Sequence, residues 1–326
     1  MAKRTRIAAL VPLLVCTVCS PPAPDADDSS ANDEAHTAAE LSGLPDGVFS
    51  RVHELSDDVY VYEQLAGPDE KVVTTLSMFV VTSEGVLVAD GQGTPEDTQR
   101  LIDEIAKVTD KPITHVVICS DHGDHTQGNV AFPTTAVFYA HPTSAATLET
   151  SASQRDRSAD APPVILPTAL VDERLVLHLG GKEVQILFLG RAHTGGDLVV
   201  YMPTERVLFM GETYFNDMFP AMRSAFPTEW IAMIERAEAM EVDMYVPGHA
   251  VVRSAGLLGR REVATHRDAV RRVIAEASRL HAAGLTADEA VEQANFGDME
   301  GWVDRVPQGP RAVRRVFMEI NGELAR

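Results

Sequence analysis

The stretch Ser120-Asp121-His122-Gly123-Asp124-His125 constrains this chain more than any other part of its sequence. It places two imidazoles and a carboxylate within four residues, directly after the apolar run Val116–Ile118. A strand that ends in such a cluster presents several nitrogen and oxygen ligands from one rigid base, and zinc prefers that mixture. The chain must then fold so that this strand end meets further ligands, and we expect a catalytic metal site.

Three further candidate ligands recur downstream in similar settings. His193, Glu212 and His249 each follow a short apolar or β-branched run and lie near a glycine. This is the pattern of side chains presented at strand ends. A lone histidine in such a place is more often structural, but four segments that share one pattern predict one shared site.

The order of these residues resembles the metallo-β-lactamase superfamily of metal-dependent hydrolases. Its usual signature is His-x-His-x-Asp-His, followed by a single histidine, a bridging acid and a last histidine. The positions that match are His122, Asp124, His125, His193, Glu212 and His249. The similarity extends from about Val59 to Val251 and includes Asp90-Gly91 as an early Asp-x-Gly element. The resemblance implies an α/β fold, a four-layer αββα sandwich with the C-terminal helices packed beside the sheet.

Two positions depart from this signature. Ser120 stands where the first histidine is expected, and Glu212 stands where an aspartate is usual. A serine hydroxyl is a poor zinc ligand, so the first metal position of the family retains only His122 and His193. Some lactamases of the superfamily carry an amide at the first position and work with one metal at the second site.

The resemblance therefore implies one tightly bound Zn²⁺ and a second that is weak or absent. The tight site comprises Asp124, His125 and His249, with Glu212 as the fourth ligand. Asp121 is either a substitute ligand or a solvated loop acid, and we favour the latter.

Several neighbouring residues have expected supporting roles. Asp124 is expected to orient the nucleophile or carry its proton, by analogy with the family. Three residues are candidates to hydrogen-bond to the ligands on the side away from the metal: Asp90, Ser120 and Asp197. Such hydrogen bonds usually fix the orientation of metal-bound imidazoles. Cys119 is expected to be a buried thiol rather than a ligand.

The implied chemistry is hydrolysis by a metal-activated water, of an ester, thioester, lactone or amide. The fold hosts all of these reactions and phosphoester hydrolysis too, so it does not choose among them. The resemblance also disfavours redox chemistry. The flavin-linked di-iron members of the family carry a glutamate where His122 stands, and the persulfide-oxidising members hold iron at the first site, which Ser120 damages. A formal charge of −20 disfavours nucleic acid as a partner. We expect a small-molecule substrate and leave the oligomeric state open.

A second function class remains in view. Ser120 and Glu212 can mark a decayed site, in a non-catalytic or weakly active metal-binding protein. Retained metal with an open, water-bound position favours the enzyme, whereas loss of zinc favours the alternative.

The N-terminus reads as an export signal. Basic residues precede the apolar run Ile7–Val18, which has the length of a signal-peptide core and is too short to span a membrane. We assign 1–20 to a signal peptide or, given Cys16 and Cys19, to a lipoprotein signal. Residues 21–48 are acidic, rich in Pro, Ala and Ser, and typical of a disordered linker. The hydrolase domain then occupies 49–326, in a periplasmic or secreted protein whose membrane contact is at most a lipid anchor.

Periodicity and turn signals predict the main elements of the domain. Thr94-Pro95 predicts an N-cap and first-turn proline for a helix to about Val108. The predicted strands are 59–62, 77–81, 86–89, 114–118, 137–139, 175–179, 184–189, 198–202, 207–210 and 244–246. Helices are expected from Thr228 to about Glu241 and over 312–324, with a capping box at Thr286. Phe215, Met218, Phe219 and Met222 either line an apolar pocket mouth or belong to the core.

Overall fold

The computed structural model describes residues 50–65, 73–154, 162–251 and 258–324. The chain divides into two units, 1–36 and 37–326, and every described residue belongs to the second. The predicted signal (1–20) and linker (21–48) lie outside the described residues. None of the helices in the described ranges is long and apolar enough to cross a membrane.

Twelve described strands form one hydrogen-bonded sheet, in the order β7-β6-β5-β4-β3-β12-β11-β10-β9-β8, with β2 also pairing with β3 and β1 with β2. The strands are β1 (Arg51–Ser56), β2 (Val59–Leu65), β3 (Val73–Thr82), β4 (Gly85–Ala89), β5 (Ile113–Val117), β6 (Val137–Ala140), β7 (Ala169–Leu170), β8 (Arg174–Leu179), β9 (Lys182–Leu187), β10 (Val199–Met202), β11 (Val207–Asn216) and β12 (Met244–Val251).

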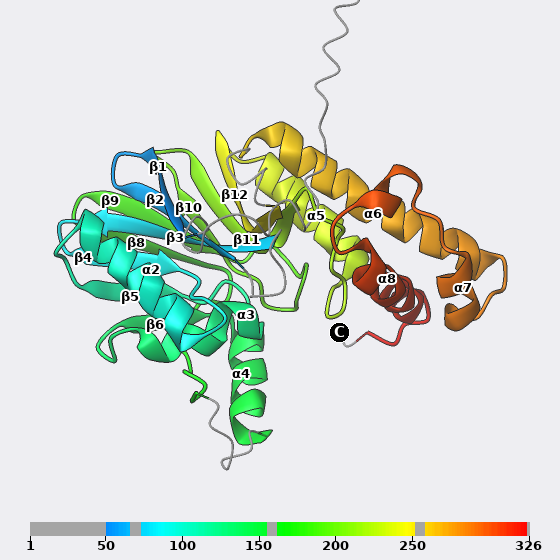
Figure 1. Cartoon of the computed structure of the whole chain (residues 1–326), viewed down its shortest axis with the longest axis horizontal. Coiled ribbons are helices and arrows are strands. Elements are labelled where there is room, and N and C mark those ends of the chain that lie inside the picture. Colours follow the sequence, from blue (N-terminus) through cyan, green and yellow to red (C-terminus); the bar gives the residue numbers. More distant parts are fainter. Residues whose placement is uncertain (1–49, 66–72, 155–161, 252–257, 325–326) are drawn as a thin grey trace, which may run out of the picture. The chain divides into compact units, whose positions relative to one another are not determined.

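Helices connect and cover these strands (Figure 1). They are α2 (Pro95–Val108), α3 (Gly123–Thr126), α4 (Pro142–Gln154), α5 (Pro227–Glu238), α6 (Arg260–Ala282), α7 (Ala287–Gln293) and α8 (Arg305–Ile320), with 3₁₀ turns η1 (Gln127–Ala131) and η3 (Gly297–Gly301).

Alternation along the strands divides the interior into three apolar clusters. In β4, Leu87 faces the cluster shared by both halves of the sheet, whereas Val88 packs toward α2. In β11, Phe209 joins that shared cluster and Leu208 faces α5, α6 and α8. Because side chains alternate across a strand, each half of the sheet has helices on one face and the other half on its opposite face. The predicted four-layer αββα sandwich is thereby confirmed, including its C-terminal helices.

The two halves of the sheet are joined at the pairing of β3 with β12. The antiparallel register places His249 opposite Thr75, while β12 runs parallel to β11 on its other side. A Cβ on Gly248 would lie 2.5 Å from the backbone carbon of Gly211, so glycine at position 248 lets β11 and β12 approach closely. This close approach brings the neighbouring residues Glu212 and His249 together.

Several local predictions are confirmed, and the strand ends need correction. Helix α2 runs from Pro95 to Val108 with Thr94 as its N-cap, and Thr286 forms the capping box. Helix α5 ends at Glu238 rather than Glu241. Strands β11 and β12 are longer than predicted, so Glu212 and His249 lie within them rather than after them. Tertiary pairing extends both strands beyond the apolar runs that identify them.

The contact between the two halves of the sheet predicts a large stability effect. Phe209 is fully buried in the shared cluster, so Phe209→Ala should lower the free energy of unfolding by about 3–5 kcal/mol. Val306 is 81% exposed on α8, and Val306→Ala should change it by less than about 0.5 kcal/mol. Urea denaturation of both variants checks this; equal midpoints would contradict the assigned core.

Candidate metal centre

The predicted ligands come from separate segments that meet at one edge of the sheet. His122 lies in the loop after β5, and Asp124 and His125 lie in the short helix α3 that follows. His193 lies in the connection between β9 and β10. All described members of the set gather into two groups whose ligand atoms lie within 4.8 Å of one another: Asp124, His125, Glu212 and His249; and His122, His193 and Glu212.

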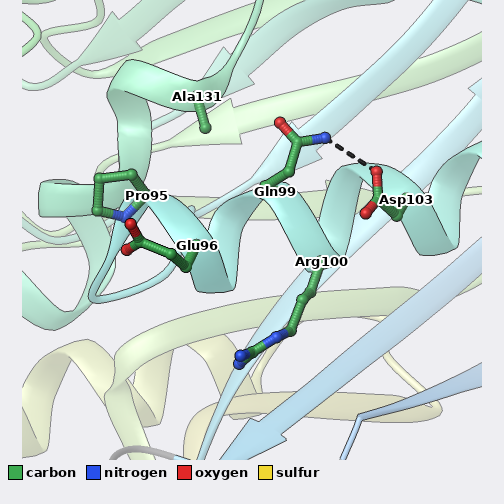
Figure 2. A pocket seen from close by; sticks show the side chains of 6 residues that line it. All are labelled: Pro95, Glu96, Gln99, Arg100, Asp103 and Ala131. Atoms are coloured by element: carbon green, nitrogen blue, oxygen red, sulfur yellow. Dashed lines mark hydrogen bonds between the residues drawn. The ribbon is translucent and has the colours of Figure 1, made fainter.

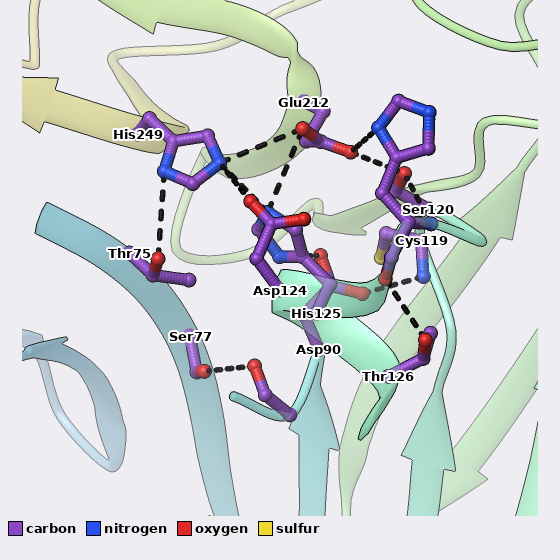
Figure 3. A network of polar contacts seen from close by, with 12 residues as sticks. Thr75, Ser77, Asp90, Cys119, Ser120, Asp124, His125, Thr126, Glu212 and His249 are labelled. Carbon is purple, nitrogen blue, oxygen red and sulfur yellow. Dashed lines mark hydrogen bonds and ion pairs between the residues drawn. The ribbon is translucent and has the colours of Figure 1, made fainter. Parts of the chain in front are cut away.

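The first group contains two imidazoles and two carboxylates (Figure 3). His249 Nε2 lies 3.1 Å from His125 Nε2 and 3.1 Å from Asp124 Oδ2. Glu212 Oε1 lies 3.5 Å from the same His249 nitrogen. His125, Glu212 and His249 are buried, whereas the Asp124 side chain is 45% exposed. Asp124 is therefore the ligand candidate through which this group faces solvent.

The second group is poorer in ligands and includes a serine contact. His193 Nε2 lies 3.0 Å from His122 Nδ1, which lies 2.9 Å from Glu212 Oε2. Ser120 is fully buried and donates its hydroxyl hydrogen to the same Glu212 oxygen. The serine thus occupies the position of the expected histidine and acts as a hydrogen-bond donor to the acid.

Glu212 connects the two groups. Its Oε2 accepts the hydrogen bond from Ser120 and lies close to His122 Nδ1. Its Oε1 lies 3.3 Å from His193 Nε2, 3.5 Å from His249 Nε2 and 3.9 Å from His125 Nε2. The extra methylene relative to aspartate therefore does not take the carboxylate out of reach of either group.

The far sides of the imidazoles in the first group are held by fixed partners. His125 Nδ1 lies 3.2 Å from Asp90 Oδ2, and Asp90 Oδ1 accepts a hydrogen bond from the Cys119 backbone N–H at 2.7 Å. His249 Nδ1 lies 3.1 Å from the Thr74 carbonyl oxygen on β3, an arrangement in which the ring donates to that carbonyl. Both rings therefore direct Nε2 into the group, as metal-binding imidazoles with outer partners do.

Asp197 and Asp121 differ from their expected settings. The Asp197 carboxylate accepts from the Thr194 N–H at 2.7 Å and from its hydroxyl at 2.6 Å, so it braces the loop that carries His193 and not the ring itself. Asp121 is not a freely solvated loop acid: it is partly buried and hydrogen-bonds to Ser144 of α4. Neither belongs to the two groups of ligand atoms.

Other predicted neighbours have structural settings. Cys119 is buried, and burial raises the pKa of its thiol well above its ordinary value, so it is a poor thiolate ligand. Phe215, Met218, Phe219 and Met222 are all buried in the cluster with α5, α6 and α8. This settles the open choice in favour of core residues.

Two buried aromatic residues lie against the histidines of the site: Phe215, which the sequence left open as a pocket-mouth or core residue, and Trp230, which it did not assign to the site. Phe215 stacks on His249 and meets His193 edge-on, with ring centroids 5.7 and 5.1 Å apart, and Trp230 lies 5.5 Å from His193. They fix the ring planes from the apolar side. The pairing of β11 with β12 brings Phe215 to His249, and the packing of α5 brings Trp230 to His193.

Opposite charges in the site shift each other's pKa. Burial alone would raise the pKa of Glu212, but His193, His125 and His122 outweigh burial and lower it well below its ordinary value. Burial and Glu212 also act against ionisation of Asp124, yet the hydrogen bond from His249 and the charges of His125 and His249 lower its pKa to about 2. Burial opposes charging of His122, but Glu212, Asp121 and Asp124 raise its pKa to about 9.

This donor set fits a divalent metal ion. Two imidazoles and two carboxylates are a ligand combination that zinc accepts in tetrahedral sites. The Nε2 atoms of His125 and His249 point at each other at 3.1 Å, and both acids are ionised beside them. A cation among these atoms satisfies all four groups at once. The residues present therefore can hold a metal ion, with the first group the more complete.

Metal affinity should depend steeply on pH. A metal ion binds neutral imidazole. In the first group burial opposes charging of His249, but Asp124 and Glu212 outweigh it and raise its pKa well above its ordinary value. At neutral pH this proton competes with the metal, and the competition weakens as pH rises. We expect zinc affinity of metal-depleted protein to rise roughly tenfold or more per pH unit between pH 6 and 8, by chelator competition. A flat profile would show that the histidines are already neutral.

A pocket open to solvent lies beside α2, and Figure 2 shows the residues that line it. It is lined by Pro95, Glu96, Gln99, Arg100, Asp103 and Ala131. Its lining shares no residue with the two ligand groups and includes no histidine or cysteine.

Comparison with known proteins identifies the family. The model of the metallo-beta-lactamase superfamily matches residues 71–249, which is more than half of the chain. The chain belongs to this superfamily. The match contains every ligand candidate and ends at His249, so the helices from α6 onward lie outside it.

Relatives within the superfamily include several enzymes. The chain is 30% identical over 143 residues to the 2,4-dinitroanisole O-demethylase subunit alpha of Nocardioides sp., covering 43% of this chain and 41% of that one. It is 24% identical over 256 residues to a linear primary-alkylsulfatase of Pseudomonas sp., covering 65% and 48%. It is 25% identical over 214 residues to a metallo-beta-lactamase type 2 of Bacillus sp., covering 64% and 79%. The chain thus spans less than half the length of the first two relatives.

Solved structures support the fold. A metallo-beta-lactamase from Pontibacter korlensis aligns with a TM-score of 0.59 at 19% identity, covering 68% of this chain and 99% of that one. A double mutant of the sec-alkyl sulfatase PisA1 aligns with a TM-score of 0.61 at 15% identity, covering 84% and 51%. At these identities the likeness shows the shared fold alone.

Proposed function

We propose that this protein is an exported zinc-dependent hydrolase that cleaves an ester, thioester, lactone or amide bond with an activated water. The observation that carries this proposal is the convergence of Asp124, His125, Glu212 and His249 at a partly open edge of the sheet. Relatives named as an alkylsulfatase and as β-lactamases support the hydrolase class. Export rests on the composition of 1–20.

We assign one dominant metal to the first group. That group offers four ligands, whereas the second offers two imidazoles and an acid oxygen already engaged by Ser120. Zinc is the metal of choice because imidazole with carboxylate suits it. A bound divalent cation supplies a water of lowered pKa and polarises the oxygen of the substrate that becomes negative.

The chain's own residues position the ligands and orient the attacking water. Asp124 is ionised, with a pKa of about 2, and its carboxylate is the solvent-facing member of the group. Its role is to accept a hydrogen bond from the attacking water and so to orient it, because a carboxylate of so low a pKa is a weak base. Asp90 and the Thr74 carbonyl hold His125 and His249 in fixed orientations, so the site requires little rearrangement when substrate enters.

A panel of chromogenic substrates tests the proposal together with metal analysis. We expect about one zinc per chain, and hydrolysis of at least one of nitrophenyl acetate, a nitrophenyl sulfate, a chromogenic cephalosporin and a nitrophenyl thioester. Chelator should abolish the activity and zinc should restore it. Purified protein that retains no metal and hydrolyses nothing would instead support a non-catalytic protein with a decayed site.

A further inference from the structure

A histidine of the C-terminal helices lies behind the aromatic residues that contact the candidate metal centre. His266 belongs to α6, which packs against α5 and β11 and lies beyond the end of the superfamily match. Its ring meets Phe215 and Trp230 edge-on, with centroid distances of 5.7 and 5.5 Å. The side chain is 2% exposed, so these contacts are made in the interior of the protein.

The same two rings, called the aromatic pair below, also contact ligand candidates of both groups. The Phe215 ring centroid lies 5.1 Å from that of His193 and 5.7 Å from that of His249, and Trp230 lies 5.5 Å from His193. Phe215 and Trp230 meet each other at 6.0 Å. His266 is therefore connected to two ligand histidines through one pair of buried rings in contact.

His193 depends on the aromatic pair more than His249 does. The His249 ring is also held by the Thr74 carbonyl, 3.1 Å from its Nδ1. The Nδ1 atom of His193 is buried, and it has no hydrogen-bond partner in the described part of the chain. Outer hydrogen bonds of this kind usually fix ligating imidazoles. Where one is missing, contact with neighbouring rings is what remains to hold the plane of the imidazole.

The His266 imidazole is neutral and acts by contact. Burial, followed by the charge of His193, lowers its pKa to about 3. Neither of its ring nitrogens has a hydrogen-bond partner among the residues described, and leaving polar atoms unpaired in the interior costs free energy. Its contribution is thus the flat ring that it places against the aromatic pair. A neutral ring also adds no positive charge that would repel a metal ion.

We propose that His266 is a positioning residue of the metal centre: it supports the aromatic pair from α6, and the pair holds the imidazoles of His193 and His249 at the angles that metal binding requires. This inference rests on the proposed function, because it concerns the same metal centre. Protein interiors are close-packed, so a ring that loses a neighbour shifts or rotates into the vacated space. Because Phe215 stacks on His249, such a shift reaches the first group as well as the second.

Variants of α6 separate positioning from packing alone. His266→Ala removes the ring, and His266→Phe keeps a flat ring without its nitrogens. Val273→Ala is the matched control, since Val273 is another fully buried side chain, two helical turns or about 10 Å further along the same face of α6. Zinc affinity of each full-length protein is measured by chelator competition at pH 8. The visible spectrum of the Co²⁺-loaded protein reports the number and angles of the metal's ligands, and thermal unfolding reports stability.

The expected result is a loss of metal affinity that follows the ring and not the stability. His266→Ala should weaken zinc binding about tenfold and shift the Co²⁺ bands, whereas His266→Phe should keep both close to those of the parent. Val273→Ala should lower the unfolding temperature and change zinc affinity by less than about twofold, because effects at separate sites are largely independent. If His266→Ala does not fold, His266→Leu fills the space without a planar ring and carries the same expectation.

Three outcomes would overturn the inference while the metal centre stands. They are parent-like affinity and spectrum in His266→Ala, equal shifts in His266→Ala and Val273→Ala, and a loss in His266→Phe as large as that in His266→Ala. A parent protein that binds neither zinc nor cobalt would overturn the proposed function and this inference with it.

Discussion

Replacing His249 with alanine should reduce bound zinc from about one per chain to almost none and lower hydrolysis by ~10³-fold or more. His249 Nε2 lies 3.1 Å from His125 Nε2 and 3.1 Å from Asp124 Oδ2, and its ring is fixed by Thr74 and by stacking on Phe215. Its removal leaves the first group with a single imidazole, that of His125, and two carboxylates. Elemental analysis after gel filtration, with initial rates on the best substrate of the panel, measures both effects.

Two other histidine variants show whether this effect is specific. His178 is exposed on β8, so His178→Ala should keep both zinc and activity. His122 belongs to the second group, so His122→Ala should retain most of the zinc if the first group holds the dominant metal. Circular dichroism confirms that each variant is folded. The assignment fails if His249→Ala keeps its zinc while His122→Ala loses it.

The local elements of the fold were largely readable from the sequence, whereas their extents were not. Thr94-Pro95 predicts the start of α2 because the cap and the first-turn proline act within a few residues. By contrast, β12 continues through Pro247 and Gly248 to Val251 because it pairs with β3 and β11, which are distant in sequence. Strand β1 and helix α4 were not predicted; the hydrophobic periodicity of α4 is weak, as only Ser144, Ala145 and Leu148 are buried.

The candidate site shows the same division. The ligand types and their order along the chain are sequence properties, so the set that the structure gathers could be proposed in advance. The hydrogen bond from Ser120 to Glu212 and the position of the Thr74 carbonyl behind His249 both depend on residues that are distant in sequence. No local pattern distinguishes these residues from ordinary turn and strand residues. Asp197 illustrates the limit: its place beside His193 is right, but its hydrogen bonds go to Thr194.

Replacing Ser120 with histidine should raise bound zinc from about one to about two per chain. Ser120 is fully buried and contacts Glu212 Oε2, beside His122 Nδ1. An imidazole there adds the third nitrogen that the second group lacks, and three histidines with a shared carboxylate form a complete zinc site. Titration of metal-depleted protein with zinc, followed by elemental analysis, measures the stoichiometry.

The matched variant Ser120→Ala separates the missing ligand from the lost hydroxyl. It removes the hydrogen bond to Glu212 without adding a nitrogen, so it should keep about one zinc per chain. Because a histidine needs more space than a buried serine, thermal unfolding must first show that Ser120→His is folded. A folded Ser120→His that still binds one zinc would mean that something other than the absent histidine limits the second group. A parent that already binds two would mean that Glu212, His122 and His193 suffice, and the assignment of one dominant metal would be withdrawn.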